Sequence, residues 1–183
     1  MSGSASPPHS LVSGEVTAAL VKRALATPPG AFCEVGVYHG GTAWHLSRAA
    51  ESQSRRIFLF DTFEGIPYKG QFDSHQVGDF RDTSLAEVQA AIPYAICIKG
   101  IFPESTRQLD PHALIRVAFV HLDCDQYESY AGALTWFAHR MVPGGVIWCD
   151  DMPALEGAAR AINEFCANTG RSVSMAEKAF IQF

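Results

Sequence analysis

The sequence has no long hydrophobic run, no cluster of basic residues and no CxxC motif, and each absence argues against a class of protein. No apolar stretch approaches the roughly 18 residues that a membrane span needs, and the N-terminus has neither the basic nor the apolar region of a signal peptide. No run of basic residues is longer than the pairs Lys22-Arg23 and Arg55-Arg56. A nucleic acid or an acidic membrane is therefore not expected as a partner.

The cysteine usage points to a reducing compartment. The five cysteines are an odd number, and most of them lie inside apolar runs, where a free cysteine behaves as a small hydrophobic residue. Because no targeting segment is recognisable, we expect a cytoplasmic protein.

Length and composition favour one folded domain. Of the 183 residues, 48% are hydrophobic and 18% are charged, with 14 basic side chains against 19 acidic ones. This composition is sufficient for a single hydrophobic core. Residues 1–10 are rich in serine and contain Pro7-Pro8, so we expect them to form a flexible tail ahead of a single domain at 11–183.

Short apolar runs alternate with longer amphipathic stretches. The short runs predict strands at Ala31–Val37, Ile57–Phe60, Tyr94–Ile98, Val117–Leu122 and Gly145–Cys149. The amphipathic stretches predict helices at Leu11–Leu25, Thr42–Glu51, Ser84–Ala91, Glu104–Leu109, Ser129–Met141 (closed by Pro143-Gly144) and Leu155–Thr169. Such alternation is typical of a doubly wound α/β domain with a mostly parallel sheet.

Two segments depart from this rhythm. Ser172–Met175 and Ala179–Phe183 are separated by so few residues that they can join only as an antiparallel hairpin. The stretch from Gly65 to Thr83 is long and irregular, and a loop of that length in a compact domain is usually functional or mobile.

Aspartates follow the ends of several predicted strands. Asp61, Asp123, Asp125, Asp150 and Asp151 each follow the end of an apolar run, within three residues of it. In open α/β sheets, ligands bind outside the carboxyl ends of the strands. We therefore expect these carboxylates to share one edge of the sheet.

The first predicted strand leads into a glycine-rich turn that ends with Gly40-Gly41-Thr42. Glycines allow a tight turn and a close backbone approach to a ligand. Asp61 follows about twenty residues later, where an acidic residue usually accepts the hydroxyls of a ribose. Together these features indicate a nucleoside-containing ligand. The alternatives are an ordinary strand-to-helix turn and a helix N-cap at Asp61.

The remaining aspartates are candidates for a metal site. Several carboxylates on one edge repel one another unless a cation lies among them, and oxygen ligands favour a hard cation such as Mg²⁺, Mn²⁺ or Ca²⁺. The alternative is that Asp123 and Asp150 cap the helices that follow them. His39 and His121 lack partners at zinc-ligand spacing.

Several common catalytic motifs are missing. The sequence contains no GxSxG nucleophile turn, no GxxxxGK[ST] phosphate loop and no GxGxxG dinucleotide motif. Hydrolase, kinase and nicotinamide-dependent oxidoreductase functions are therefore not favoured.

The motifs together resemble those of S-adenosylmethionine-dependent methyltransferases, and more narrowly the macrocin O-methyltransferase family, which methylates sugar hydroxyls of antibiotics. The matching segments are Glu34–Thr42, Phe60–Pro67 (with the specific string Asp-Thr-Phe-Glu-Gly-Ile-Pro), Gly78–Phe80, Lys99–Phe102, Leu122–Ser129, Pro143–Gly145, Asp150-Asp151 and Ala158–Ile162. The resemblance implies a seven-stranded class I methyltransferase sheet that ends in the antiparallel hairpin.

The resemblance also implies a set of cofactor-binding residues. Glu34 and Gly36 would border the methionine moiety, and Asp61 would bind the ribose. Backbone near Gly78–Phe80 or Lys99–Phe102 would face the adenine. The full implied set is Glu34, Gly36, Tyr38, Gly40, Thr42, Asp61, Thr62, Phe63, Gly78, Asp79, Phe80, Gly100, Ile101, Phe102 and Asp123.

In that family a divalent cation is held by carboxylates that match Asp123, Asp150 and Asp151. Asp125 or Asp123 would take the proton of the acceptor hydroxyl, with Asp125 favoured. The alternative is a base from the Gly65–Thr83 stretch, which contains Asp73, His75 and Asp79.

The expected function is therefore Mg²⁺-dependent O-methylation of a small-molecule hydroxyl, of sugar or polyketide type. The alternatives are a metal-independent methyltransferase and a non-catalytic S-adenosylmethionine-binding module. The part before the first strand is shorter than is usual in the family, so the acceptor site is expected to be more open, completed by a second subunit, or built for another substrate. Exposed apolar residues such as Phe72 and Phe80 are compatible with a homodimer.

Overall fold

The computed structural model describes residues 6–110 and 112–183. Residues 1–5 of the predicted tail lie outside the described residues. The elements follow in the order α1 (Gly14–Leu25), β1 (Ala31–Val35), α2 (Gly41–Ser52), β2 (Ile57–Asp61), α3 (Leu85–Ala91), β3 (Ile96–Lys99), η1 (Glu104–Gln108), β4 (Val117–Leu122), α4 (Tyr127–Ala138), β5 (Met141–Cys149), α5 (Glu156–Thr169), β6 (Val173–Met175) and β7 (Ala179–Gln182). No helix among the described residues is long and apolar enough to cross a membrane.

The strands form one sheet in the order β3-β2-β1-β4-β5-β7-β6. β1 to β5 run parallel, whereas β7 pairs antiparallel with both β5 and β6. The predicted doubly wound sheet with a C-terminal antiparallel hairpin is confirmed. The strand order reverses between β1 and β4, and a reversal of this kind creates a crevice at the carboxyl ends of the two strands.

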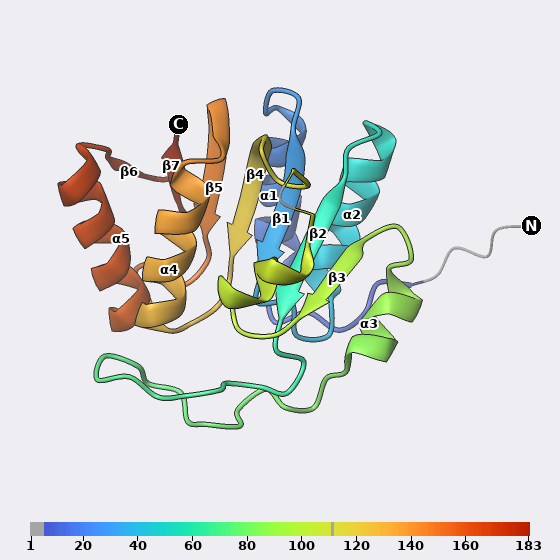
Figure 1. Cartoon of the computed structure of the whole chain (residues 1–183), viewed down its shortest axis with the longest axis horizontal. Coiled ribbons are helices and arrows are strands. Elements are labelled where there is room, and N and C mark those ends of the chain that lie inside the picture. Colours follow the sequence, from blue (N-terminus) through green and yellow to red (C-terminus); the bar gives the residue numbers. More distant parts are fainter. Residues whose placement is uncertain (1–5, 111) are drawn as a thin grey trace, which may run out of the picture.

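Helices cover both faces of the sheet (Figure 1). α1, α2 and α3 bury Leu20, Leu46 and Val88 on one face. α4 and α5 bury Leu134 and Ile162 on the other. Because both faces are covered, the central strands are mostly apolar. The exceptions are Glu34 in β1, Asp61 at the end of β2 and His121 in β4. The long segment between β2 and α3 passes below the arrowheads of the parallel strands, along the edge where the aspartates were expected (Figure 1).

The boundary between α4 and β5 differs from the prediction. The sequence predicted a helix through Met141 with Pro143-Gly144 as its stop, but α4 ends at Ala138 and β5 begins at Met141. The pairing with β4 jumps from Val117–Met141 to Phe119–Val146, so Pro143 and the glycines after it lie in an irregular, bulged part of β5. A bulge is one of the few places in a sheet that tolerate proline.

The turns after β1 and β4 are in direct backbone contact. The backbone N–H of Asp123 donates to Val35 at 2.9 Å. Gly36 has a φ of +84°, and a Cβ at this position would lie 1.8 Å from the carbonyl oxygen of Asp123. Only glycine fits there, because it has no Cβ and readily adopts a positive φ. This contact sets the distance between the glycine-rich turn and the first of the clustered aspartates.

Gly36→Ala should therefore cost much more stability than the loss of backbone freedom alone. Gly170 is a matched control, because it also has a positive φ (+69°), but among the described residues other than its chain neighbours no atom lies within 4 Å of the position that a Cβ would take. We expect Gly170→Ala to lower the free energy of unfolding by about 1–2 kcal/mol and Gly36→Ala to lower it by about 3 kcal/mol or more, measured by urea denaturation. Equal losses in the two variants would contradict the close contact.

Candidate functional site

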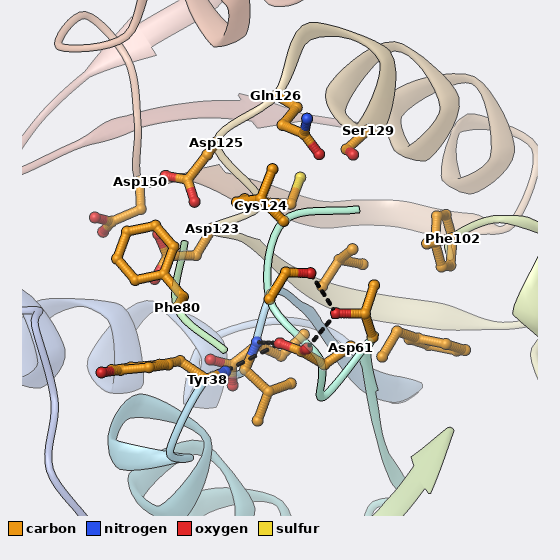
Figure 2. A pocket seen from close by; sticks show the side chains of 18 of the residues that line it. Tyr38, Asp61, Phe80, Phe102, Asp123, Cys124, Asp125, Gln126, Ser129 and Asp150 are labelled. Carbon is orange, nitrogen blue, oxygen red and sulfur yellow. Dashed lines mark hydrogen bonds between the residues drawn. The ribbon is translucent and has the colours of Figure 1, made fainter. Parts of the chain in front are cut away.

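A cavity of about 300 Å³ lies at the carboxyl ends of the parallel strands. It opens where the strand order reverses, and Figure 2 shows side chains of several strand ends converging on it. The sequence-predicted residues that line it are Glu34, Gly36, Tyr38, Thr42, Asp61, Thr62, Phe80, Gly100, Ile101, Phe102, Asp123, Asp125, Asp150 and Asp151. The volume is at the lower end of the range for small-molecule sites.

Four of the predicted cofactor-binding residues are not among the described residues that line the cavity. Gly40 is the N-cap of α2, and Phe63 is buried in the core between the sheet and α1–α3. Gly78 donates its backbone N–H to Ile66 at 2.9 Å. The carboxylate of Asp79 accepts a hydrogen bond from a backbone N–H of its own loop at 2.7 Å. These residues shape the loops around the cavity.

Asp61 joins two loops at one end of the cavity (Figure 2). Its Oδ2 accepts from the backbone N–H groups of Val37 (2.6 Å) and Tyr38 (3.0 Å), and its Oδ1 accepts from that of Phe63 at 2.6 Å. The Thr62 hydroxyl, 3.4 Å from Oδ1, donates over a shorter distance to a backbone carbonyl. A carboxylate has about four lone-pair positions, so within residues 6–110 and 112–183 one position on Oδ1 is left for a ligand hydroxyl.

The other end of the cavity is acidic, and Figure 2 shows Asp123, Asp125 and Asp150 there. Burial, with the neighbouring charge of Asp151, raises the pKa of Asp123 well above its usual range. The same two causes raise the pKa of Asp125 to about 8. Burial also raises the pKa of Asp151, although hydrogen bonds from the Tyr130 hydroxyl (2.8 Å) and the Asp125 backbone N–H (3.1 Å) favour its ionised form. The cluster is therefore short of positive charge.

Two cationic side chains partly balance the cluster. Lys178 Nζ donates to Asp150 Oδ2 at 2.8 Å. His121 is fully buried, with Nδ1 3.2 Å from Glu34 Oε1 and Nε2 3.8 Å from Asp150 Oδ1; neither contact has hydrogen-bond geometry. Burial lowers the pKa of His121, but Asp150 and Glu34 outweigh it and raise that pKa to about 10. Burial raises the pKa of Asp150, but His121 and Lys178 bring it below its usual value.

The predicted metal ligands share this end of the cavity without forming a ready-made site. In residues 6–110 and 112–183, no three His, Cys, Asp or Glu side chains come together as a metal-binding group. The donor set still fits a hard divalent cation, because its atoms are carboxylate oxygens. Asp150 Oδ1 is in addition buried without a hydrogen-bond partner in the described part of the chain.

The aspartates at the strand ends do not cap helices. The N-caps of α3, α4 and α5 are Ser84, Gln126 and Leu155. The α4 N-terminus instead receives a carboxylate from the long loop, because Asp73 Oδ1 accepts from the backbone N–H of Tyr127 at 2.8 Å. Asp73, one of the alternative bases, thus fastens the loop to α4.

Sequence reasoning missed part of the cavity wall. His9–Val12 line the cavity, although residues 1–10 were assigned to the tail. The hydroxyl oxygen of Ser10 lies 3.3 Å from that of Thr42, and a Cβ on Gly41 would come within 2.4 Å of Ser10 Cβ. The composition of residues 1–10 does not indicate this packing. The sequence feature related to it is Gly41, where a side chain would collide with Ser10.

Comparison with known proteins assigns the family. The family model described as Macrocin-O-methyltransferase (TylF) matches residues 15–177. The chain belongs to the macrocin O-methyltransferase family. The resemblance read from the sequence motifs is thus confirmed.

One curated relative of this family member is, by name, an O-methyltransferase of a rhamnosyl-bearing compound. The chain is 30% identical over 169 residues to 8-demethyl-8-(2,3-dimethoxy-alpha-L-rhamnosyl)-tetracenomycin-C 4'-O-methyltransferase of Streptomyces olivaceus, covering 81% of this chain and 62% of that protein. The chain therefore spans less than two thirds of that relative.

Solved structures share the fold of this family member. The calicheamicin methyltransferase CalS11 has a TM-score of 0.80 at 19% identity, covering 92% of this chain and 77% of that one. The O-methyltransferase NovP has a TM-score of 0.72 at 21% identity, covering 92% and 78%. At these identities the likeness shows the fold alone.

Because His121 is buried between two carboxylates in this macrocin O-methyltransferase family member, we expect its replacement to destabilise the fold. His121→Leu leaves the Glu34 and Asp150 carboxylates without the cation between them, and we expect a loss of about 3–5 kcal/mol of unfolding free energy, measured by urea denaturation. His139→Leu, at an exposed position, should stay within about 0.5 kcal/mol of the wild type. Adding Glu34→Leu to His121→Leu should recover part of the loss. Wild-type stability of the His121→Leu variant would contradict the ion group.

Proposed function

We propose that this protein transfers the methyl group of S-adenosylmethionine to a hydroxyl group of a small natural product, of sugar type. The observation that carries the proposal is one cavity with Asp61 at one end and the acidic cluster of Asp123, Asp125, Asp150 and Asp151 at the other. Family membership supports the reaction class, and the names of the relatives support a natural-product acceptor.

The nucleoside is assigned to the Asp61 end. The free lone-pair position on Asp61 Oδ1 would accept one ribose hydroxyl. The backbone N–H of Gly100 donates to the Asp61 carbonyl at 2.9 Å, so the turn after β3 lies beside Asp61. Gly100–Phe102 is therefore the segment that would face the adenine, rather than Gly78–Phe80. Glu34 and Gly36, between the two ends, would border the methionine moiety.

Methyl transfer requires that the acceptor oxygen is aligned with the methyl carbon–sulfur bond and that the hydroxyl proton is removed. The acceptor oxygen forms a bond to the methyl carbon as the carbon–sulfur bond breaks, S-adenosylhomocysteine leaves, and the hydroxyl proton goes to a base. Asp125 is our candidate base, because it lines the cavity and its side chain is only 20% exposed. Its backbone φ of +61° is sparsely populated in residues with a side chain, and such strain is often found at functional sites. Asp123 is the second candidate.

Asp123, Asp150 and Asp151 would hold a divalent cation in this proposal. Their oxygen donors, the buried unpartnered Oδ1 of Asp150 and the charge imbalance of the cluster support it. When bound, such a cation supplies Lewis-acid polarisation of the acceptor hydroxyl. The Lys178 ammonium group, which already contacts Asp150, would then share this carboxylate with the cation.

Calorimetric titration with S-adenosylhomocysteine tests the nucleoside end. We expect the wild type to bind, and Asp61→Asn to weaken binding about 10- to 100-fold, since a hydrogen bond to a charged group is worth about 1.5–3 kcal/mol. Glu64→Gln is the matched control, because Glu64 is close in sequence but its side chain is 72% exposed; its affinity should match the wild type. A wild type that does not bind S-adenosylhomocysteine would contradict the proposal.

The acidic end is tested by removing two carboxylates. The Asp150→Asn/Asp151→Asn variant should lose Mn²⁺ binding in calorimetry and S-adenosylhomocysteine formation with a rhamnoside acceptor, while it keeps S-adenosylhomocysteine affinity within about threefold. EDTA should reproduce the loss of turnover in the wild type. Turnover that survives both changes would favour a metal-independent methyltransferase. Cofactor binding with no turnover of any acceptor would favour a non-catalytic binding module.

A further inference from the structure

Phe80 lines the cavity and packs against His75 and Tyr38. The Gly78–Phe80 segment was a candidate for the adenine site, beside Asp61. In Figure 2 the Phe80 ring appears on the same side of the view as Asp123 and Asp150, and far from Phe102. Phe80 and these aspartates line the same cavity.

Distances between side chains support this placement. The ring centroid of Phe80 is 5.0 Å from that of His75 in an edge-to-face arrangement. His75 Nε2 is 3.6 Å from Asp125 Oδ1, and its Nδ1 is 3.7 Å from Asp79 Oδ2. A single residue, His75, thus separates the phenyl ring from the candidate base.

Tyr38 also packs against the Phe80 ring. The centroids of Tyr38 and Phe80 are 5.6 Å apart, again edge to face. The Tyr38 hydroxyl lies 3.0 Å from both carboxylate oxygens of Asp82, and the Thr83 hydroxyl donates to the Tyr38 carbonyl. The long loop and the turn after β1 are therefore joined around Phe80.

The backbone shows that the ring is held at this place. Phe80 has a φ of +60° and Tyr38 a φ of +53°, a region that bulky residues rarely occupy. Each ring is only half-buried, so core packing does not account for the strain. A strained backbone conformation at a half-exposed aromatic residue is typical of residues that contact a ligand in a cavity wall.

We propose that Phe80, supported by Tyr38 and His75, forms the apolar wall of the acceptor subsite and selects acceptors whose ring carries an apolar C–H face. The inference rests on the proposed methyl transfer, because it places an acceptor hydroxyl at the acidic cluster. A six-membered deoxysugar ring meets both requirements, since it presents hydroxyls at its edge and C–H groups on its face. The negative face of the phenyl ring attracts such C–H groups.

The test separates the acceptor subsite from the cofactor subsite. Methyl α-L-rhamnopyranoside is the acceptor probe, and its saturation-transfer NMR signal is recorded on protein loaded with S-adenosylhomocysteine. We expect Phe80→Ala to reduce the signal at least fivefold while S-adenosylhomocysteine affinity, measured by calorimetry, stays within twofold. Phe80→Tyr should keep both, because it preserves the ring.

Phe72→Ala is the matched control. Phe72 belongs to the same long loop and is also half-buried, but its ring packs on Tyr127 at a centroid distance of 5.4 Å. This variant should keep the rhamnoside signal.

Each other outcome contradicts a particular claim. A tenfold loss of S-adenosylhomocysteine affinity in Phe80→Ala would show that Phe80 contributes to cofactor binding, and it would overturn the inference. So would an unchanged rhamnoside signal in that variant, or the absence of a signal in the loaded wild type. Failure of the wild type to bind S-adenosylhomocysteine would overturn the proposed methyl transfer itself.

Discussion

Like-charged carboxylates are crowded at one edge of the sheet, and the rest of the site depends on how that charge is balanced. His121 lies between Glu34 and Asp150, Lys178 contacts Asp150, and the other aspartates of the cluster line the same cavity. Burial makes each unpaired carboxylate costly, which is why the pKa values of Asp123 and Asp125 rise while that of Asp150 falls beside its cations. The remaining negative charge is concentrated where an acceptor hydroxyl would need a base.

The second constraint is the close contact between the turns after β1 and β4. Because Gly36 has no side chain, the turn that bonds to Asp61 approaches the backbone of Asp123 directly. The two ends of the cavity are thereby held in one rigid unit, and the long loop closes over them through Asp73 at α4 and through Tyr38 at the glycine-rich turn. Positioning of this kind is the main contribution that a protein makes to a transfer between two bound substrates.

Much of this arrangement could be predicted from the sequence, because it follows from local rules. Apolar runs and the aspartates after them placed Asp61, Asp123 and Asp150 at one edge, as the parallel sheet requires. The start of β5 could not be predicted, because Pro143 reads as a helix stop unless the bulge is known. The positions of His9–Val12, Phe80 and His121 depend on long-range packing, for which a single sequence carries no periodic signal.

The most direct test of the account is a crystal structure of the protein with S-adenosylhomocysteine. The account predicts a ribose hydroxyl on Asp61 Oδ1, the adenine against Gly100–Phe102, and the sulfur atom facing the space between Asp123 and Phe80. S-adenosylhomocysteine bound with its adenine against Phe80, or bound outside this cavity, would contradict it.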